Sequence, residues 1–139
     1  MKIPIKRLDK TLPIPKHARE HDAGLDIYAA KDVLLKPHEP QIVPTGIQTA
    51  FPPGFVIHIW DRSSLAKKGV KTLGGVIDAT YRGEYMVSMV NLTKEPISIT
   101  KGDRIAQMVI VKHETIEFED VDELDVTNRN QHGFGSTGR

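Results

Sequence analysis

The tripeptide Arg62-Ser63-Ser64 combines three residues that are suited to binding phosphate. The arginine offers a planar fork of N–H donors, the two serines add hydroxyl donors, and a helix that starts here would add unpaired backbone N–H groups. An ordinary helix N-cap beside an exposed arginine would use the same residues. Taken alone, these residues leave both a phosphate site and a simple cap open.

The segment Gly74–Gly83, which reads GGVIDATYRG, could hold a general base. Its first two glycines permit a turn or a close approach of the backbone to a ligand. Asp78 follows two aliphatic residues, so it could stand at the mouth of a partly buried strand and accept a proton from water. The alternative is a hairpin in which Asp78 only bonds the turn backbone. Residue chemistry alone does not separate the two.

Asp26 and Gln107 are polar residues inside apolar, strand-like runs. Asp26 could lie on the surface or pair with an arginine such as Arg62, and Gln107 could simply face solvent. The six histidines show no metal-ligand spacing, so we read them as structural or surface residues. The glycine-rich or nucleophile motifs of P-loop, Rossmann and α/β-hydrolase proteins do not occur, so these classes have no support.

Short strands are the elements that must position these side chains. Nine prolines and eleven glycines punctuate the chain, and runs rich in Val, Ile, Thr and aromatic residues lie between them. Phe55–Trp60 and Tyr85–Val90 are examples, being apolar at every second position or nearly throughout. Many short strands at this spacing predict an all-β sandwich or barrel. Only Ser63–Lys68 predicts a helix, with hydroxyl residues to cap it and Gly69 to end it.

The overall composition limits the kinds of partner. The 19 basic and 18 acidic residues leave a net charge of +1, which argues against a large nucleic-acid surface. The chain has no cysteine, which excludes disulfides and thiolate metal sites. It shows no apolar run of membrane-spanning length and no secretory signal. We therefore expect a single-domain, soluble, cytoplasmic protein without nucleic-acid or membrane partners.

The C-terminal part of the chain has a different character. Residues 117–125 are rich in acids, and residues 128–139 are polar and glycine-rich. Such a tail cannot bury enough apolar surface to offset its ordering entropy, so we expect it to be flexible. Phe134, between two glycines, is the exception and suggests a contact with a partner.

Five segments resemble, in order and spacing, the signature motifs of the trimeric dUTP diphosphatase family. Each is weak alone, but the five in order are highly specific. They are AGLD (Ala23–Asp26), RSSLAKKG (Arg62–Gly69), GGVIDATYRGE (Gly74–Glu84), GDRIAQ (Gly102–Gln107) and GFGSTG (Gly133–Gly138). The resemblance implies a jelly-roll-like β-barrel of residues 1–125, followed by a flexible tail of residues 126–139 that closes an active site. It also implies a homotrimer with three shared active sites.

The resemblance further implies hydrolysis of dUTP to dUMP and diphosphate. Asp78 matches the aspartate that orients the water attacking the α-phosphorus, and Mg²⁺ is expected to be held mainly by the substrate phosphates and water, without a dedicated protein site. Asp26 matches an aspartate that supports Arg62. The phosphate-binding positions implied are Arg62, Ser63, Ser64, Gln107, Arg129, Ser136 and Thr137. The positions implied for the base and the sugar are Thr72, Gly75, Ile77, Tyr81 and Phe134, with Tyr81 packing against the deoxyribose and Phe134 stacking on the base.

The sequence departs from the family pattern at a few positions. Thr72 stands where an asparagine often reads uracil, Asp61 stands where proline usually precedes the arginine, and Thr80 stands where a second aspartate is frequent. In the tail, Asn130 and His132 replace residues that are usually glycine. Uracil could still be read by backbone groups of the Gly74–Gly83 hairpin.

Two alternatives remain from the residues. A dCTP deaminase-like enzyme is similar in fold, but its chemistry needs a glutamate where this chain has Ser88, and a serine cannot shuttle the protons of deamination. A non-catalytic nucleotide-binding regulatory module on the same fold is the second. The joint presence of Asp78, Tyr81 and Phe134 argues against it.

Overall fold

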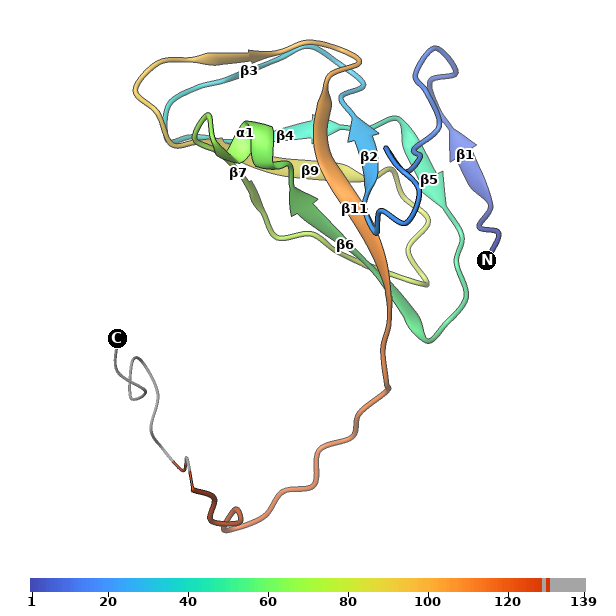
Figure 1. The fold of residues 1–139 in the computed structure, drawn as a ribbon, viewed down its shortest axis with the longest axis vertical. Coiled ribbons are helices and arrows are strands. Elements are labelled where there is room, and N and C mark those ends of the chain that lie inside the picture. The colour runs from blue at the N-terminus through green and yellow to red at the C-terminus, as the bar shows by residue number, and fades with distance from the viewer. Residues whose placement is uncertain (129, 131–139) are drawn as a thin grey trace.

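The computed structural model describes residues 1–128 and 130 of the 139-residue chain. This part folds into eleven strands and one short helix (Figure 1). The elements are β1 (Ile5–Arg7), β2 (Leu25–Tyr28), β3 (Val33–Leu35), β4 (Pro40–Pro44), β5 (Ile47–Thr49), β6 (Phe55–Asp61), α1 (Ser63–Ala66), β7 (Val70–Leu73), β8 (Val76–Asp78), β9 (Met86–Asn91), β10 (Ile97–Ile99) and β11 (Arg104–Lys112).

The strands pair in four antiparallel groups. A four-stranded sheet has the order β2-β11-β6-β8, and a three-stranded sheet has the order β4-β9-β7. Two further pairs, β1-β5 and β10-β3, complete the arrangement. The all-β prediction with a single short helix is confirmed, and the fold is of the jelly-roll kind.

The core follows from the alternation of side chains along the strands. In β6, Ile57 and Ile59 are buried, while His58 between them and Trp60 after them face outward. Each fully buried aliphatic side chain contributes about 1.5–3 kcal/mol relative to an exposed one. Tyr85 is buried in the same core, and its hydroxyl is satisfied by a hydrogen bond with the Thr49 hydroxyl. Period-2 patterning in the sequence therefore fixes which face of the four-stranded sheet turns inward.

The helix is shorter and capped differently than the sequence suggests. It covers Ser63–Ala66 instead of reaching Lys68. Arg62 has extended dihedral angles (φ −90°, ψ 131°) and is itself the N-cap, without a side-chain hydrogen bond to the helix. Both serines consequently lie inside the first turn instead of capping it. The helix ends at Ala66 with Lys67 as its C-cap, so Gly69, expected to end it, lies three residues further on with φ +81° in the turn that leads to β7.

The chain leaves the barrel after β11. The segment 113–128 has no regular structure, runs away from the strands in Figure 1, and is exposed along its whole length. It carries apolar side chains such as Phe118, which is 90% exposed, and Leu124, which is 83% exposed. Within the described residues, no helix has the length and apolar character needed to cross a membrane. The division expected between residues 125 and 126 stays a prediction.

Candidate active site

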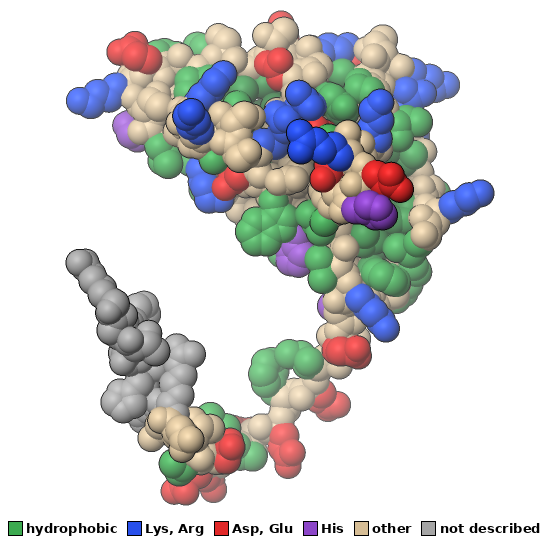
Figure 2. Space-filling view, in the orientation of Figure 1, with side chains coloured by type: hydrophobic (Ala, Val, Ile, Leu, Met, Phe, Trp, Pro, Cys, Tyr) green, Lys and Arg blue, Asp and Glu red, His purple; other side chains and the backbone are tan. Residues whose placement is uncertain are grey.

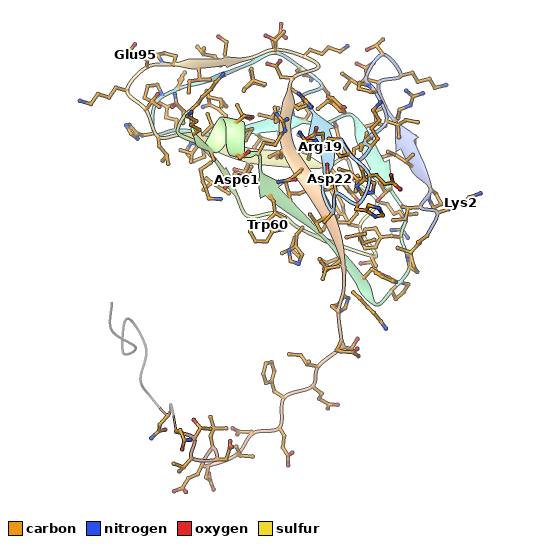
Figure 3. All side chains as sticks on the ribbon, viewed as in Figure 1. Lys2, Arg19, Asp22, Trp60, Asp61 and Glu95 are labelled. Carbon is orange, nitrogen blue, oxygen red and sulfur yellow. The ribbon has the colours of Figure 1, made fainter. Side chains whose placement is uncertain are left out.

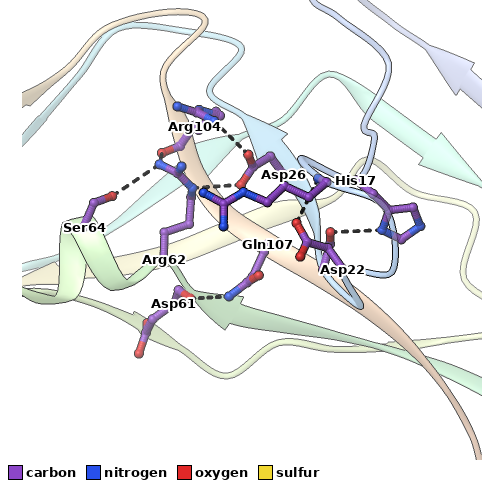
Figure 4. A network of polar contacts seen from close by, with 10 residues as sticks. His17, Asp22, Asp26, Asp61, Arg62, Ser64, Arg104 and Gln107 are labelled. Atoms are coloured by element: carbon purple, nitrogen blue, oxygen red, sulfur yellow. Dashed lines mark hydrogen bonds and ion pairs between the residues drawn. The ribbon is translucent and has the colours of Figure 1, made fainter.

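A pair of arginines gathers around one carboxylate at the end of the four-stranded sheet. Arg62 Nε donates to Asp26 Oδ1 at 2.8 Å, and Arg104 Nη1 donates to Asp26 Oδ2 at 3.1 Å (Figure 4). Arg62 Nη1 also donates to the Arg104 carbonyl at 3.1 Å and to Ser64 Oγ at 3.4 Å. Two guanidiniums share one carboxylate, so this end keeps a net positive charge suited to anions. Figure 2 shows Lys and Arg side chains gathered over this end of β11.

Of the two alternatives for Asp26, a surface position or a pair with an arginine, the structure shows the second. The Asp26 side chain is 14% exposed. Arg62 was the partner expected from the sequence, but Arg104, 78 residues away from Asp26 in the chain, was not expected. The only signal for Arg104 was a charge at the start of the apolar run GDRIAQ.

Gln107 is held beside this network by two neighbours. Its Nε2 donates to the Asp61 carbonyl at 2.9 Å. Its Oε1 lies directly against Gly24, where any Cβ would overlap it. Gly24 does not need a left-handed φ, so its role is to leave room for the amide. The register places Asp26, Gln107 and Trp60 opposite one another on neighbouring strands, with their side chains on the same outward face.

Asp78 and Tyr81 form a second cluster. Asp78 is exposed at the end of β8, and the Tyr81 N–H donates to its carbonyl at 3.0 Å. The Tyr81 hydroxyl donates to the Glu84 carbonyl at 3.1 Å, and its ring covers Gly83 so closely that a Cβ there would overlap it. A shallow hollow of about 160 Å³ opens here, lined by Val76, Ile77, Asp78, Tyr81, Glu84 and Met86.

Of the predicted base-binding positions, Ile77 lines this hollow, while Gly75 and Thr72 come before it in the chain. Gly75 has φ +122° and accepts a hydrogen bond from the Ile59 N–H at 2.7 Å, which carries the chain from one sheet to the other. Ile77 pairs with Ile57 of β6. Thr72 lies in β7 of the three-stranded sheet, is 6% exposed, and donates both its N–H and its hydroxyl to Asp61 Oδ1, each at 2.7 Å.

The two clusters are separated on the outward face of one sheet. Asp78 is opposite Val56 on β6, four positions before Trp60, and Gln107 lies on the next strand over. Four residues along a strand span about 13 Å and two strand spacings about 10 Å, so the Asp78 and Gln107 backbones lie about 16 Å apart. A single chain thus does not bring Asp78 to the Arg62 end of the sheet.

Four predicted contacts belong to the tail. Arg129, Phe134, Ser136 and Thr137 lie outside the described residues. Ser63 and Ser64 are exposed on α1 next to Arg62, which places them at the arginine end of the sheet.

Comparison with known proteins gives a consistent result. A dUTPase family model matches residues 10–138. The deoxyuridine 5'-triphosphate nucleotidohydrolase of Corynebacterium glutamicum is 50% identical, covering 99% of this chain and 95% of that protein. The enzyme of the same name from Finegoldia magna is 44% identical over 91% of this chain and 92% of its own.

Solved structures agree in fold. The dUTPase of Staphylococcus bacteriophage 80alpha with dUpNHpp superposes with a TM-score of 0.88 at 30% identity, covering 99% of both chains. A mutant dUTPase from phage phi11 of S. aureus superposes with a TM-score of 0.80 at 26% identity over 88% of this chain and 98% of its own, and is described as showing the coordination of a structural Mg(II) ion.

Proposed function

The chain belongs to the dUTPase family and hydrolyses dUTP, and we propose that Asp78 activates the water that attacks the α-phosphorus, releasing dUMP and diphosphate. The observation that carries this proposal is the exposed Asp78 carboxylate at the rim of the hollow that Tyr81 walls. A positioned carboxylate base contributes about 10²–10⁴-fold to the rate.

Tyr81 is proposed to select the sugar. Its ring is held by two contacts, the hydroxyl bond to Glu84 and the close packing on Gly83. A ring fixed in this way offers a flat wall to a deoxyribose and no hydrogen-bond partner for a 2′-hydroxyl. The backbone groups of Gly75 and Ile77 are proposed to read the uracil edge, and Phe134 of the tail to stack on the base.

The arginine end of the sheet is proposed to bind the phosphates. Arg62, Ser63, Ser64 and Gln107 supply donors here, and Asp26 keeps the Arg62 guanidinium in place. Arg129, Ser136 and Thr137 of the tail are proposed to add further donors. A charge-assisted hydrogen bond contributes roughly 1.5–3 kcal/mol, so several are needed to offset the ordering of a tail segment.

Mg²⁺ is proposed to bind together with the substrate phosphates and not at a site made by the chain's carboxylates alone. Among residues 1–128 and 130, no three His, Asp or Glu side chains come together as a metal site. Asp26 is already neutralised by two arginines. Mg²⁺ commonly binds through one or two carboxylates together with substrate phosphates. We propose that Mg²⁺ is held mainly by the triphosphate and water, where it would neutralise phosphate charge. A cytoplasmic location is also proposed.

A homotrimer with shared sites is proposed because one chain keeps its two half-sites apart. A head-to-tail contact that joins the Asp78 end of one copy to the Arg62 end of the next repeats in the same sense, and it forms a ring when its rotation closes. The sheet face between the two ends is apolar enough for such a contact, with Trp60 56%, Val76 62% and Val111 41% exposed. Figure 3 shows Trp60 projecting away from the barrel, and Figure 2 shows hydrophobic side chains gathered on this face.

The activity is tested by diphosphate release from dUTP with Mg²⁺, beside dCTP and dTTP, while ammonia is monitored. Diphosphate from dUTP without ammonia from dCTP is expected. Ammonia release would overturn the argument from Ser88, and no turnover of any nucleotide would favour a regulatory binding module.

Shared sites are tested by mixing subunits. Asp78→Asn and Arg62→Ala trimers are each expected to be nearly inactive, since every site lacks one half. After subunit exchange at equal amounts, about one quarter of the sites should combine two intact halves. Activity that stays at the level of the separate variants, despite demonstrated exchange, would contradict shared sites.

A further inference from the structure

Asp61 ends β6 directly before Arg62 and is bound by three donors from β7. Thr72 N and Thr72 Oγ1 each donate to Asp61 Oδ1 at 2.7 Å, and Lys71 Nζ approaches Asp61 Oδ2 at 2.6 Å. The Asp61 carbonyl accepts the Gln107 amide. Asp61, the last residue of β6, thus connects the four-stranded sheet to β7 of the three-stranded sheet and also holds Gln107 on β11.

The geometry of this contact follows from strand alternation. Asp61 is two positions after Ile59 and four after Ile57, so it lies on the core-facing side of β6. A carboxylate on that side must find donors, and β7 supplies them at the edge of the barrel. Partial burial raises the pKa of Asp61, but the combined hydrogen bonds from Lys71 and Thr72 outweigh it and hold the pKa below its usual value. The carboxylate therefore stays charged at neutral pH.

The turn that Asp61 precedes has few other anchors, of which one is Leu65, partly buried against the core. Helix α1 spans four residues, none of them buried, and it lacks a side-chain cap. The Arg62 side chain bonds to Asp26 and, at 3.4 Å, to Ser64 Oγ, which fixes the guanidinium but does not hold the backbone at the start of the turn. Asp61 anchors the backbone from which Arg62, Ser63 and Ser64 all project.

We propose that Asp61 is a positioning residue for the triphosphate, and that Thr72 serves Asp61 and does not contact the base. The carboxylate aligns the Arg62–Ser64 turn, and its carbonyl orients the Gln107 amide. Thr72 is almost fully buried with its hydroxyl committed to Asp61, so uracil selection falls to the backbone of Gly75 and Ile77. The inference rests on the proposed phosphate role of the arginine end.

The test compares ligands that occupy opposite ends of the substrate. Inhibition of dUTP hydrolysis by diphosphate reports the phosphate end, and inhibition by deoxyuridine reports the base and sugar end. Asp61→Ala is expected to weaken diphosphate inhibition about tenfold or more, because small misplacements of phosphate donors are costly, and to leave deoxyuridine inhibition unchanged. Thr72→Val removes one donor at nearly constant volume and should weaken diphosphate about threefold, with the dUTP over dCTP preference intact. Thr72→Ser keeps both donors and should behave as the parent chain does.

Asp9 offers a matched control. It accepts bonds from Thr11 N at 2.9 Å, from Thr11 Oγ1 at 2.6 Å and from Lys101 at 2.5 Å, the same donor set as Asp61 but away from either half-site. Asp9→Ala is expected to lower the melting temperature without changing either inhibition constant. If Asp61→Ala only lowers stability in the same way, the positioning role is wrong.

Two further outcomes would also overturn the inference. A shift of the preference between dUTP and dCTP in Thr72→Val would return Thr72 to the base site. Equal weakening of deoxyuridine and diphosphate inhibition in Asp61→Ala would mean that Asp61 does not act on the phosphate end alone. Arg62→Ala separates this inference from the underlying proposal. If Arg62→Ala leaves diphosphate inhibition unchanged, the phosphate end itself is misassigned; if it weakens diphosphate while Asp61→Ala does not, only the positioning role fails.

Discussion

Replacing Gly24 with alanine is expected to lower the dUTP-hydrolysing activity while leaving the stability of the fold nearly unchanged. The new methyl group would overlap Gln107 Oε1, while the other nearby atoms of Gln107 lie at 3.1 Å or more. The clash is therefore with the far end of a flexible side chain, which can swing away. Gln107 then loses its 2.9 Å bond to the Asp61 carbonyl and no longer presents its amide beside Asp26 and Arg62.

The change in stability is expected to be small. Losing one hydrogen bond costs about 0.5–1.5 kcal/mol. The alanine restricts the unfolded chain and returns about 0.4–1 kcal/mol, because Gly24 has no left-handed φ that alanine would strain. The two effects nearly cancel, so the melting temperature should move by no more than about 4 °C. The kcat/KM for dUTP should fall about tenfold or more, because a proposed phosphate donor is displaced.

The assay is a double-mutant cycle in thermal denaturation and in dUTP hydrolysis, at fixed protein concentration. If Gly24→Ala acts only through Gln107, adding it to Gln107→Ala costs no further activity. In that background the clash is gone, so the alanine should stabilise the protein. Additive losses of activity in the double variant would refute the reasoning, since they would mean that Gly24 acts through the backbone and not through Gln107.

The remaining predictions concern single positions. Asp78→Asn should bind nucleotide nearly normally and turn over at least about 10²-fold more slowly; unchanged turnover would rule out the base assignment. Truncation before Arg129 should leave the trimer intact in light scattering and abolish most activity, whereas loss of the trimer would make the tail structural. Bonds from Lys101 and Thr11 lower the pKa of Asp9 to about 2 from 3.8. Its contribution to stability is therefore full above about pH 4 and is lost as the pH falls through about 2. Asp9→Asn should make the melting temperature less dependent on pH within that range. His38 has φ 59°, and His38→Gly should raise the melting temperature by about 2–3 °C because relief of the left-handed strain exceeds the entropy cost of glycine.

The sequence was informative where a function needs only neighbouring residues. Alternation in Phe55–Trp60 identifies β6 and its buried face, because a strand turns every second side chain to the same side. Arg62-Ser63-Ser64 and Gly74–Gly83 could be recognised as sites for chemistry because their reactive groups are adjacent in the chain. Even so, the residues of Gly74–Gly83 alone did not show whether Asp78 is a general base or only bonds the turn. The interpretation as a general base depended on the resemblance of five segments to one family.

The local cap of α1 shows the limit of residue patterns. Hydroxyl residues predict a cap, but the backbone of Arg62 is extended and takes that position itself. A shift of one residue changes which side chains face a ligand. Ser63 and Ser64 remain exposed as a result, with their hydroxyls beside the arginine and not engaged by the helix end.

Contacts between distant residues were decided only by the tertiary structure. Arg104 and Asp26 meet because β11 and β2 are paired in one particular register, and no local pattern encodes that register. Thr72 lies at a position that the family resemblance assigns to the base, yet Asp61 binds it from another sheet. The local patterns of the chain were enough to place most strands and to point out the motifs. The packing of two sheets determined which carboxylate each donor reaches, and the length of one sheet keeps Asp78 and Arg62 of the same chain apart.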